Sequence, residues 1–128
     1  MARRWLQLCR GSSRIVLLVG QYAVKLPRVS SLYRVAQGVR CNRAEVEAWT
    51  QRIYPNLCPL LWSSPGSLVV VMPRARIMSD SEFDAWFESD EWPHFVDQDT
   101  PYELKSADAG FLPDGRRVMV DYGVEGYR

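Results

Sequence analysis

Residues 15–27 read IVLLVGQYAVKLP, and this stretch predicts two antiparallel strands joined by a tight turn. Both arms are rich in β-branched and aliphatic side chains, which favour strands. Gly20-Gln21 suits a two-residue turn whose first residue has a positive φ, and Pro27 closes the second arm. Because side chains alternate along a strand, Ala23 and Lys25 share one face of the second arm. The first expected element is therefore a β-hairpin that carries a lysine.

A helix is predicted to begin at Asn42, whose side chain can cap the first turn. Glu45 lies three residues later, where its side chain can reach back to the backbone N–H of the cap. Residues 28–41 give mixed signals, and we expect a loop there with at most one helical turn. An apolar stripe then follows at helical spacing until Pro55: Val46, Trp49 and Ile53.

The second half of the chain predicts one more central strand, one more helix and a small hairpin. The strand spans residues 68–72 and lacks polar alternation, so we expect it to be covered on both faces. Ser79 and Glu82 form a capping signature for a helix that Trp92-Pro93 would end. The hairpin pairs residues 111–112 with 118–120 around Pro113-Asp114-Gly115. Strands and helices in this order indicate an α+β fold.

Composition indicates one globular domain, residues 1–128, with 47% hydrophobic and 24% charged residues. The formal net charge of +1 gives no electrostatic reason to expect nucleic acid or an anionic membrane as a partner. Three cysteines, at positions 9, 41 and 58, show no metal-ligand spacing, and their odd number argues against a disulfide framework. No apolar run is long enough to span a membrane. We therefore expect a cytoplasmic protein.

Several polar side chains are placed where they could handle a phosphate group. Lys25 lies on a strand beside the small residue Ala23, which leaves room for a flat base. Glu45 is expected on the inner side of the following helix. Three further acids follow: Glu103, Asp108 and, at the end of the last strand, Asp121.

In this order the motifs resemble the protein-kinase-like superfamily. YAVK at 22–25 looks like the strand lysine motif of that family, and NRAE at 42–45 supplies a helix glutamate. LVVVMPRA at 68–75 resembles the fifth strand and hinge, with Met72 at the gatekeeper position. ELKSAD at 103–108 resembles the catalytic loop, and DYG at 121–123 resembles the D-F-G metal motif.

The spacing of these motifs is close to that of the family: 20 residues from Lys25 to Glu45, 5 from Glu103 to Asp108, and 13 from there to Asp121. The whole set is most similar to the shortened kinase-like proteins of phages and bacteria. The resemblance implies a reduced kinase-like fold, with an antiparallel N-lobe sheet and one helix C. Residues 11–78 would form the N-lobe and hinge, and residues 79–128 a vestigial C-lobe.

The resemblance also implies roles for individual residues. Lys25 would neutralise the phosphates of ATP or another purine nucleotide and would pair with Glu45. Ala23 and Met72 would contact the base. Asp108 and Asp121 would hold Mg²⁺, a hard cation that prefers carboxylate oxygens and water. Glu103 would accept a proton from the attacking hydroxyl.

The chain also departs from the family pattern. Glu103 stands where the family has aspartate, and Asp108 where it has asparagine. The glycine-rich phosphate loop is reduced to Gly11-Ser12-Ser13, and the chain is short between the hinge and the catalytic loop. Since phosphoryl transfer depends mainly on positioning and charge, we expect the transferase activity to be atypical or lost.

Three hypotheses follow. The leading one is a minimal kinase-like protein that binds a purine nucleotide with Mg²⁺. The rival is a non-catalytic interaction protein, a pseudokinase that a phage could encode, which binds and regulates a partner protein in the host cytoplasm. The third is an unrelated α+β domain, in which Glu45 only completes a helix cap and Asp121-Tyr122-Gly123 is an ordinary turn.

Overall fold

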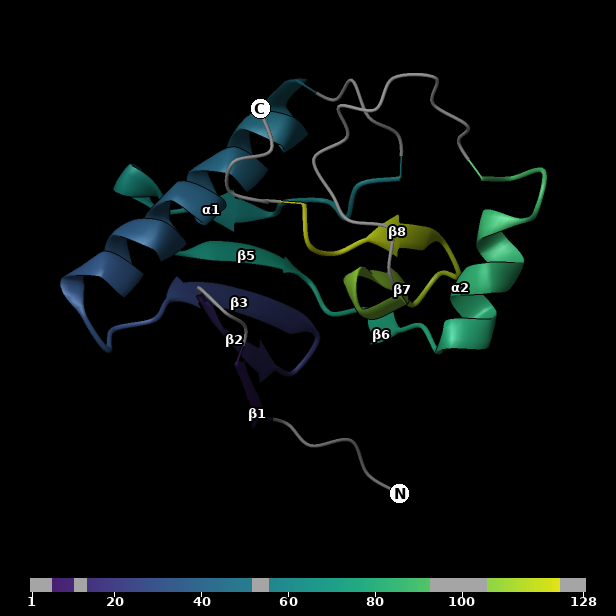
Figure 1. Ribbon diagram of the computed structural model, residues 1–128, viewed down its shortest axis with the longest axis horizontal. Coiled ribbons are helices and arrows are strands. Elements are labelled where there is room, and N and C mark those ends of the chain that lie inside the picture. The colour runs from purple at the N-terminus through teal and green to yellow at the C-terminus, as the bar shows by residue number, and fades with distance from the viewer. Residues whose placement is uncertain (1–5, 11–13, 52–55, 93–105, 123–128) are drawn as a thin grey trace.

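The first half of the chain folds into a five-stranded antiparallel sheet with the strand order β1-β2-β3-β5-β4. The computed structural model describes residues 6–10, 14–51, 56–92 and 106–122. The strands are β1 (Leu6–Arg10), β2 (Arg14–Val19), β3 (Tyr22–Pro27), β4 (Trp62–Ser63) and β5 (Val70–Pro73). Figure 1 shows the helix α1 crossing this sheet, while α2 lies beyond the second, smaller sheet.

The predicted hairpin is confirmed as β2 and β3. Gly20 has a φ of 57°, as a two-residue turn of this kind requires. The register pairs Val16 with Lys25 and places Ala23 opposite Met72 of β5. β1 was not predicted, although Leu6 and Leu8 alternate with Gln7 in the pattern of a strand.

Helix α1 (Leu32–Gln51) begins ten residues before the predicted start. Its first turn is capped by Ser31, whose Oγ accepts a hydrogen bond of 3.1 Å from the backbone N–H of Arg34. The prediction of a loop over residues 28–41 was therefore wrong from Leu32 onward. The start signal is weak because the first turn contains no acidic residue and Gly38 lies inside the helix. The predicted stop at Pro55 lies outside the described residues.

The predicted third strand is β5, and its position inside the sheet between β3 and β4 is confirmed. It starts at Val70, two residues later than expected, because a short 3₁₀ turn, η1 (Pro65–Ser67), precedes it. Val70 and Met72 are buried, whereas Val71 is only partly so. The expected cover is therefore complete on the face of Val70 and Met72 and partial on the face of Val71.

The second half forms a three-stranded antiparallel sheet of β6 (Arg76–Ile77), β7 (Ala109–Phe111) and β8 (Arg117–Met119), preceded by the short helix η2 (Ser106–Asp108). β7 and β8 are the predicted C-terminal hairpin, shifted slightly toward the N-terminus, and Gly115 in its turn has a φ of 91°. β6 was not predicted. In the structure it follows the proposed hinge directly and continues the chain into the second sheet.

Helix α2 (Asp80–Phe87) has the predicted capping box. The Oγ of Ser79 accepts from the backbone N–H of Glu82 at 3.2 Å, and Glu82 Oε1 accepts from the N–H of Ser79 at 2.9 Å. The helix ends at Phe87, before the predicted stop at Trp92. Trp92 instead folds back, and its ring centroid lies 4.6 Å from that of Trp86.

One continuous apolar core runs from the first sheet to α2. At one end of the core lie Val70 and Met72 of β5. At the other end lie Met119 of β8 and Trp86 of α2. Residues 56–58 join the two halves, because the N–H of Cys58 donates to the carbonyl of Met119 at 2.9 Å. In the part of the chain that the structure describes, no helix is both long and apolar enough to cross a membrane.

Candidate functional site

Lys25 and Glu45 form the ion pair that the family resemblance implies, at 2.8 Å between Nζ and Oε2. Lys25 comes from β3 and Glu45 from α1, which packs along β3. Both side chains are buried, and that of Glu45 is 0% exposed. Lys25 Nζ also donates to the backbone carbonyl of Val120. The pair therefore connects the sheet, the helix and the segment that follows β8.

That segment, residues 120–122, is held on several sides. The N–H of Val120 donates to the carbonyl of Asp108 at 2.7 Å. Tyr122 is fully buried, and its hydroxyl donates to the carbonyl of Cys58 at 2.7 Å. Its backbone N–H donates to Glu45 Oε2 at 3.2 Å. These contacts place Asp121 beside the Lys25–Glu45 pair.

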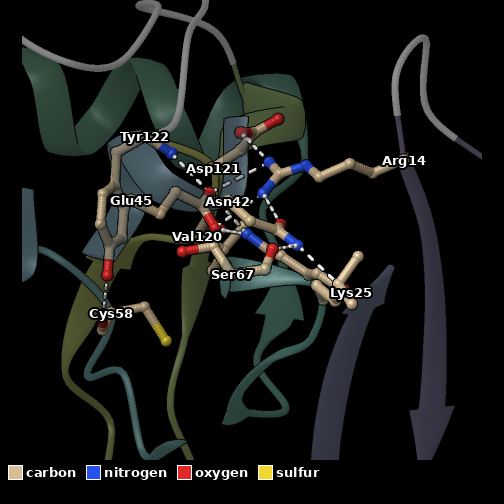
Figure 2. Close-up of polar contacts among 10 residues, drawn as sticks. Arg14, Lys25, Asn42, Glu45, Cys58, Ser67, Val120, Asp121 and Tyr122 are labelled. Atoms are coloured by element: carbon tan, nitrogen blue, oxygen red, sulfur yellow. Dashed lines mark hydrogen bonds and ion pairs between the residues drawn. The ribbon is translucent and has the colours of Figure 1, made fainter. Parts of the chain in front are cut away.

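Arg14, the first residue of β2, completes the cluster, and the sequence hypotheses missed it. Its guanidinium donates to both carboxylate oxygens of Glu45, at 2.8 and 3.0 Å, in the two-pronged geometry that arginine favours. It also donates to Asp121 Oδ1 at 2.8 Å. Figure 2 shows these side chains converging from β2, β3, α1 and the segment after β8.

The hairpin register contained the signal for Arg14. Val16 is paired with Lys25, so their side chains lie on the same face of the sheet. Arg14 lies two residues before Val16 and thus faces the same way. An arginine one step along that face from the lysine is within reach of the same carboxylate.

Asn42 is not a helix cap but a buried member of the site. It lies inside α1 and is 0% exposed. Its Oδ1 accepts from Arg14 at 3.1 Å, and its Nδ2 donates to the carbonyl of Ser67 at 2.9 Å. The reading of Glu45 as a mere cap partner was wrong for the same reason, since it lies well past the start of α1.

The four charged groups balance one another. Arg14 and Lys25 are cations, and Glu45 and Asp121 are anions. Burial alone would raise the pKa of Glu45, but the charges of Arg14 and Lys25 and their hydrogen bonds outweigh burial and hold that pKa at about 2. For Arg14, burial alone would lower the pKa, but the charges of Glu45 and Asp121 raise it above its ordinary value. Both groups thus remain charged at neutral pH.

Because the pKa of Glu45 is low in the folded protein, the free energy of unfolding falls at acidic pH. Unfolded Glu45 binds a proton near its ordinary pKa of 4.5, whereas folded Glu45 resists protonation down to about 2. Its contribution is therefore present above pH 4.5 and is lost as pH falls through this window, by about 3 kcal/mol in total. Urea unfolding at a series of pH values between neutral and strongly acidic will measure this loss.

The control for this pH dependence is Glu45→Gln, which cannot titrate. Its free energy of unfolding should fall less steeply with acid than that of the parent. Identical slopes for the two proteins would contradict the assignment. Glu82→Gln is a useful second comparison, because Arg76 and the helix cap hold the pKa of this partly exposed carboxyl at about 2 as well.

The structure describes some of the remaining predicted site residues and not others. Ala23 and Met72 lie directly opposite each other on β3 and β5, on the same face as Lys25. Asp108 is buried at the end of η2, and its carbonyl receives the N–H of Val120. Glu103 and the reduced glycine-rich loop at residues 11–13 lie outside the described residues. Within the described ranges, no three His, Cys, Asp or Glu side chains cluster as metal ligands.

Comparison with known proteins supports the fold assignment. No protein-family model matches the chain, and no curated protein matches it. Two crystal structures of WbdD, one of them with the kinase inhibitor LY294002, superpose with TM-scores of 0.52 and 0.50 at 12% identity. Each match covers 94% of this chain but only 33% and 32% of WbdD, so the chain spans about a third of its length.

At this identity the similarity shows the fold alone. Two antiparallel sheets and two α-helices, with the Lys25–Glu45 pair linking sheet and helix, define a small α+β domain with a reduced kinase-like fold.

Proposed function

We propose that the protein binds a purine nucleotide such as ATP on the sheet face that carries Lys25, as a shortened kinase-like protein of the phage and bacterial kind. The observation that carries the proposal is the buried Lys25–Glu45 ion pair, tied to the segment that bears Asp121. The ammonium group of Lys25 lies on a strand and is held in position by the carboxylate of Glu45. A cation fixed in this way is suited to neutralising phosphate charge. Ala23, a small side chain opposite Met72, would leave room for the base.

Phosphoryl transfer would require more groups than nucleotide binding alone. Phosphoryl transfer would need Glu103 as the base and Asp108 and Asp121 as Mg²⁺ ligands, following the family pattern. Asp121 already pairs with Arg14, which weakens its case as a metal ligand. We therefore propose atypical or lost transferase activity, in the cytoplasm, where ATP is plentiful.

Chemical unfolding in the presence of nucleotide tests the binding proposal. A ligand that binds only the native state stabilises it by about 2.7 kcal/mol at roughly a hundredfold excess over Kd. We expect ATP to raise the free energy of unfolding of the parent, and Lys25→Met to abolish this increase. Arg43→Met is the matched control, because it removes a cation from an exposed position of the same α1 and should leave the increase intact.

A second candidate is the interaction protein, which one surface feature favours. Val29, Leu32 and Tyr33 are 78%, 88% and 63% exposed around the start of α1. Neighbouring apolar side chains this exposed are typical of surfaces that bind another protein. No stabilisation by millimolar ATP, with or without Mg²⁺, would contradict the nucleotide proposal and favour this one.

A further inference from the structure

Arg14 has no role in the nucleotide-binding hypothesis, yet it contacts two acidic groups of the site, Glu45 and Asp121. Its guanidinium spans Glu45 and Asp121, with each closest N–O distance at 2.8 Å. The side chain is only 7% exposed. A buried cation without partners would be strongly unfavourable. The contacts of Arg14 to two carboxylates are therefore required for it to lie in this position.

The residues around Asp121 do not fit a resident Mg²⁺ while Arg14 stays in place. Mg²⁺ requires a near-octahedral shell of oxygen ligands and water. One carboxylate oxygen of Asp121 already accepts from a guanidinium. A divalent cation at this carboxylate would also face the positive charge of Arg14 at short range, which is repulsive.

Arg14 is also difficult to displace. Besides its bonds to Glu45 and Asp121, it donates to Asn42 Oδ1 at 3.1 Å, and Asn42 in turn holds the carbonyl of Ser67. Moving Arg14 away would break its hydrogen bonds to Glu45, Asp121 and Asn42 and leave buried polar groups without these partners. Loss of Arg14 from the site would therefore be costly.

Arg14 changes the net charge of the site. Lys25, Glu45 and Asp121 together carry a net negative charge, which would repel a polyphosphate. A bound metal ion would ordinarily offset such a charge. Arg14 brings the set to neutrality without a metal.

We propose that Arg14 takes the place of the divalent cation at Asp121, so that the site binds a nucleotide polyphosphate free of metal. This inference rests on the proposed function, since it specifies the form of the nucleotide that the same site accepts. Lys25 remains the group that meets the phosphates, and Arg14 acts through Asp121 and Glu45 as a positioning and charge-balancing residue.

Titration calorimetry with ATP, in EDTA and in excess Mg²⁺, tests the inference. For the parent we expect the two Kd values to agree within about threefold, a small difference in binding free energy. Arg14→Met should weaken binding in EDTA by about tenfold or more, because it leaves the negative charge of Asp121 uncompensated near the polyphosphate. Arg43→Met should behave as the parent does in both buffers.

Asp121→Asn provides a second variant that does not depend on changing a buried residue, because the Asp121 side chain is 45% exposed. It removes the negative charge that Arg14 compensates and leaves the charge of Arg14 in place, so metal-free ATP should bind more tightly than it does to the parent. Loss of binding in EDTA on this substitution would overturn the inference.

Measurements on the parent protein distinguish the role of Arg14 from nucleotide binding itself. Binding that needs Mg²⁺, with an affinity about tenfold or more weaker in EDTA, would overturn the role of Arg14 but leave nucleotide binding standing. Absence of binding in both buffers would overturn both.

Discussion

Replacing Glu45 with alanine is expected to lower the free energy of unfolding by about 3–5 kcal/mol, because it leaves buried charges without their partner. Glu45 is fully buried and pairs with Arg14 and Lys25, both of which are nearly buried themselves. After the substitution the half-exposed Asp121 would still pair with Arg14, but Lys25 would have lost its carboxylate partner. A loss of this size is a large part of the stability of a typical domain. Urea denaturation, with the midpoint and slope both recorded, measures it.

Glu47→Ala is the matched control for this experiment. Glu47 lies on the same helix, carries the same charge and is exposed. We expect its substitution to change stability by no more than about 0.5 kcal/mol. If Glu45→Ala cost as little as Glu47→Ala, the buried cluster would not form as described.

Replacing Trp86 with alanine is expected to cost about 3–5 kcal/mol, the usual range for a large aromatic ring removed from a core. Trp86 is 2% exposed, and its ring meets that of Trp92 at 4.6 Å and that of Phe83 at 6.4 Å, both edge to face. Its loss would leave a cavity between α2 and the rest of the core. Urea denaturation again gives the magnitude.

Phe87→Ala is the control for Trp86. Phe87 lies on the next position of α2 and contacts the same aromatic cluster, but it is 41% exposed. Because less apolar surface is removed from the interior, we expect a loss below about 1.5 kcal/mol. Equal losses at the two positions would show that Trp86 is not the centre of this cluster.

The sequence predicts best where a local pattern decides the structure. The hairpin of β2 and β3 follows from two apolar arms and a glycine turn, and the start of α2 follows from Ser79 and Glu82. Neither depends on distant parts of the chain. The approach of Lys25 to Glu45 was expected only from the family resemblance, and the structure forms that ion pair.

The sequence predicts poorly where a polar residue has two equally good local explanations. Asn42 followed by Glu45 has the form of a capping signature, yet both residues are buried inside α1. Only the tertiary contacts, Arg14 from one side and Ser67 from the other, distinguish a buried asparagine from a cap. The role of Arg14 was missed for the same reason, because it depends on strand register and on a carboxylate far along the chain.

Glu45 connects α1 to three other segments: β2 through Arg14, β3 through Lys25 and the chain after β8 through the N–H of Tyr122. An outward rotation of α1 would break all three connections together and expose opposite charges that now compensate one another. The helix, the sheet and the final segment are therefore expected to move as a single rigid body. Regulation of this protein would then act by blocking or opening access to the site around Lys25, rather than by rotating α1.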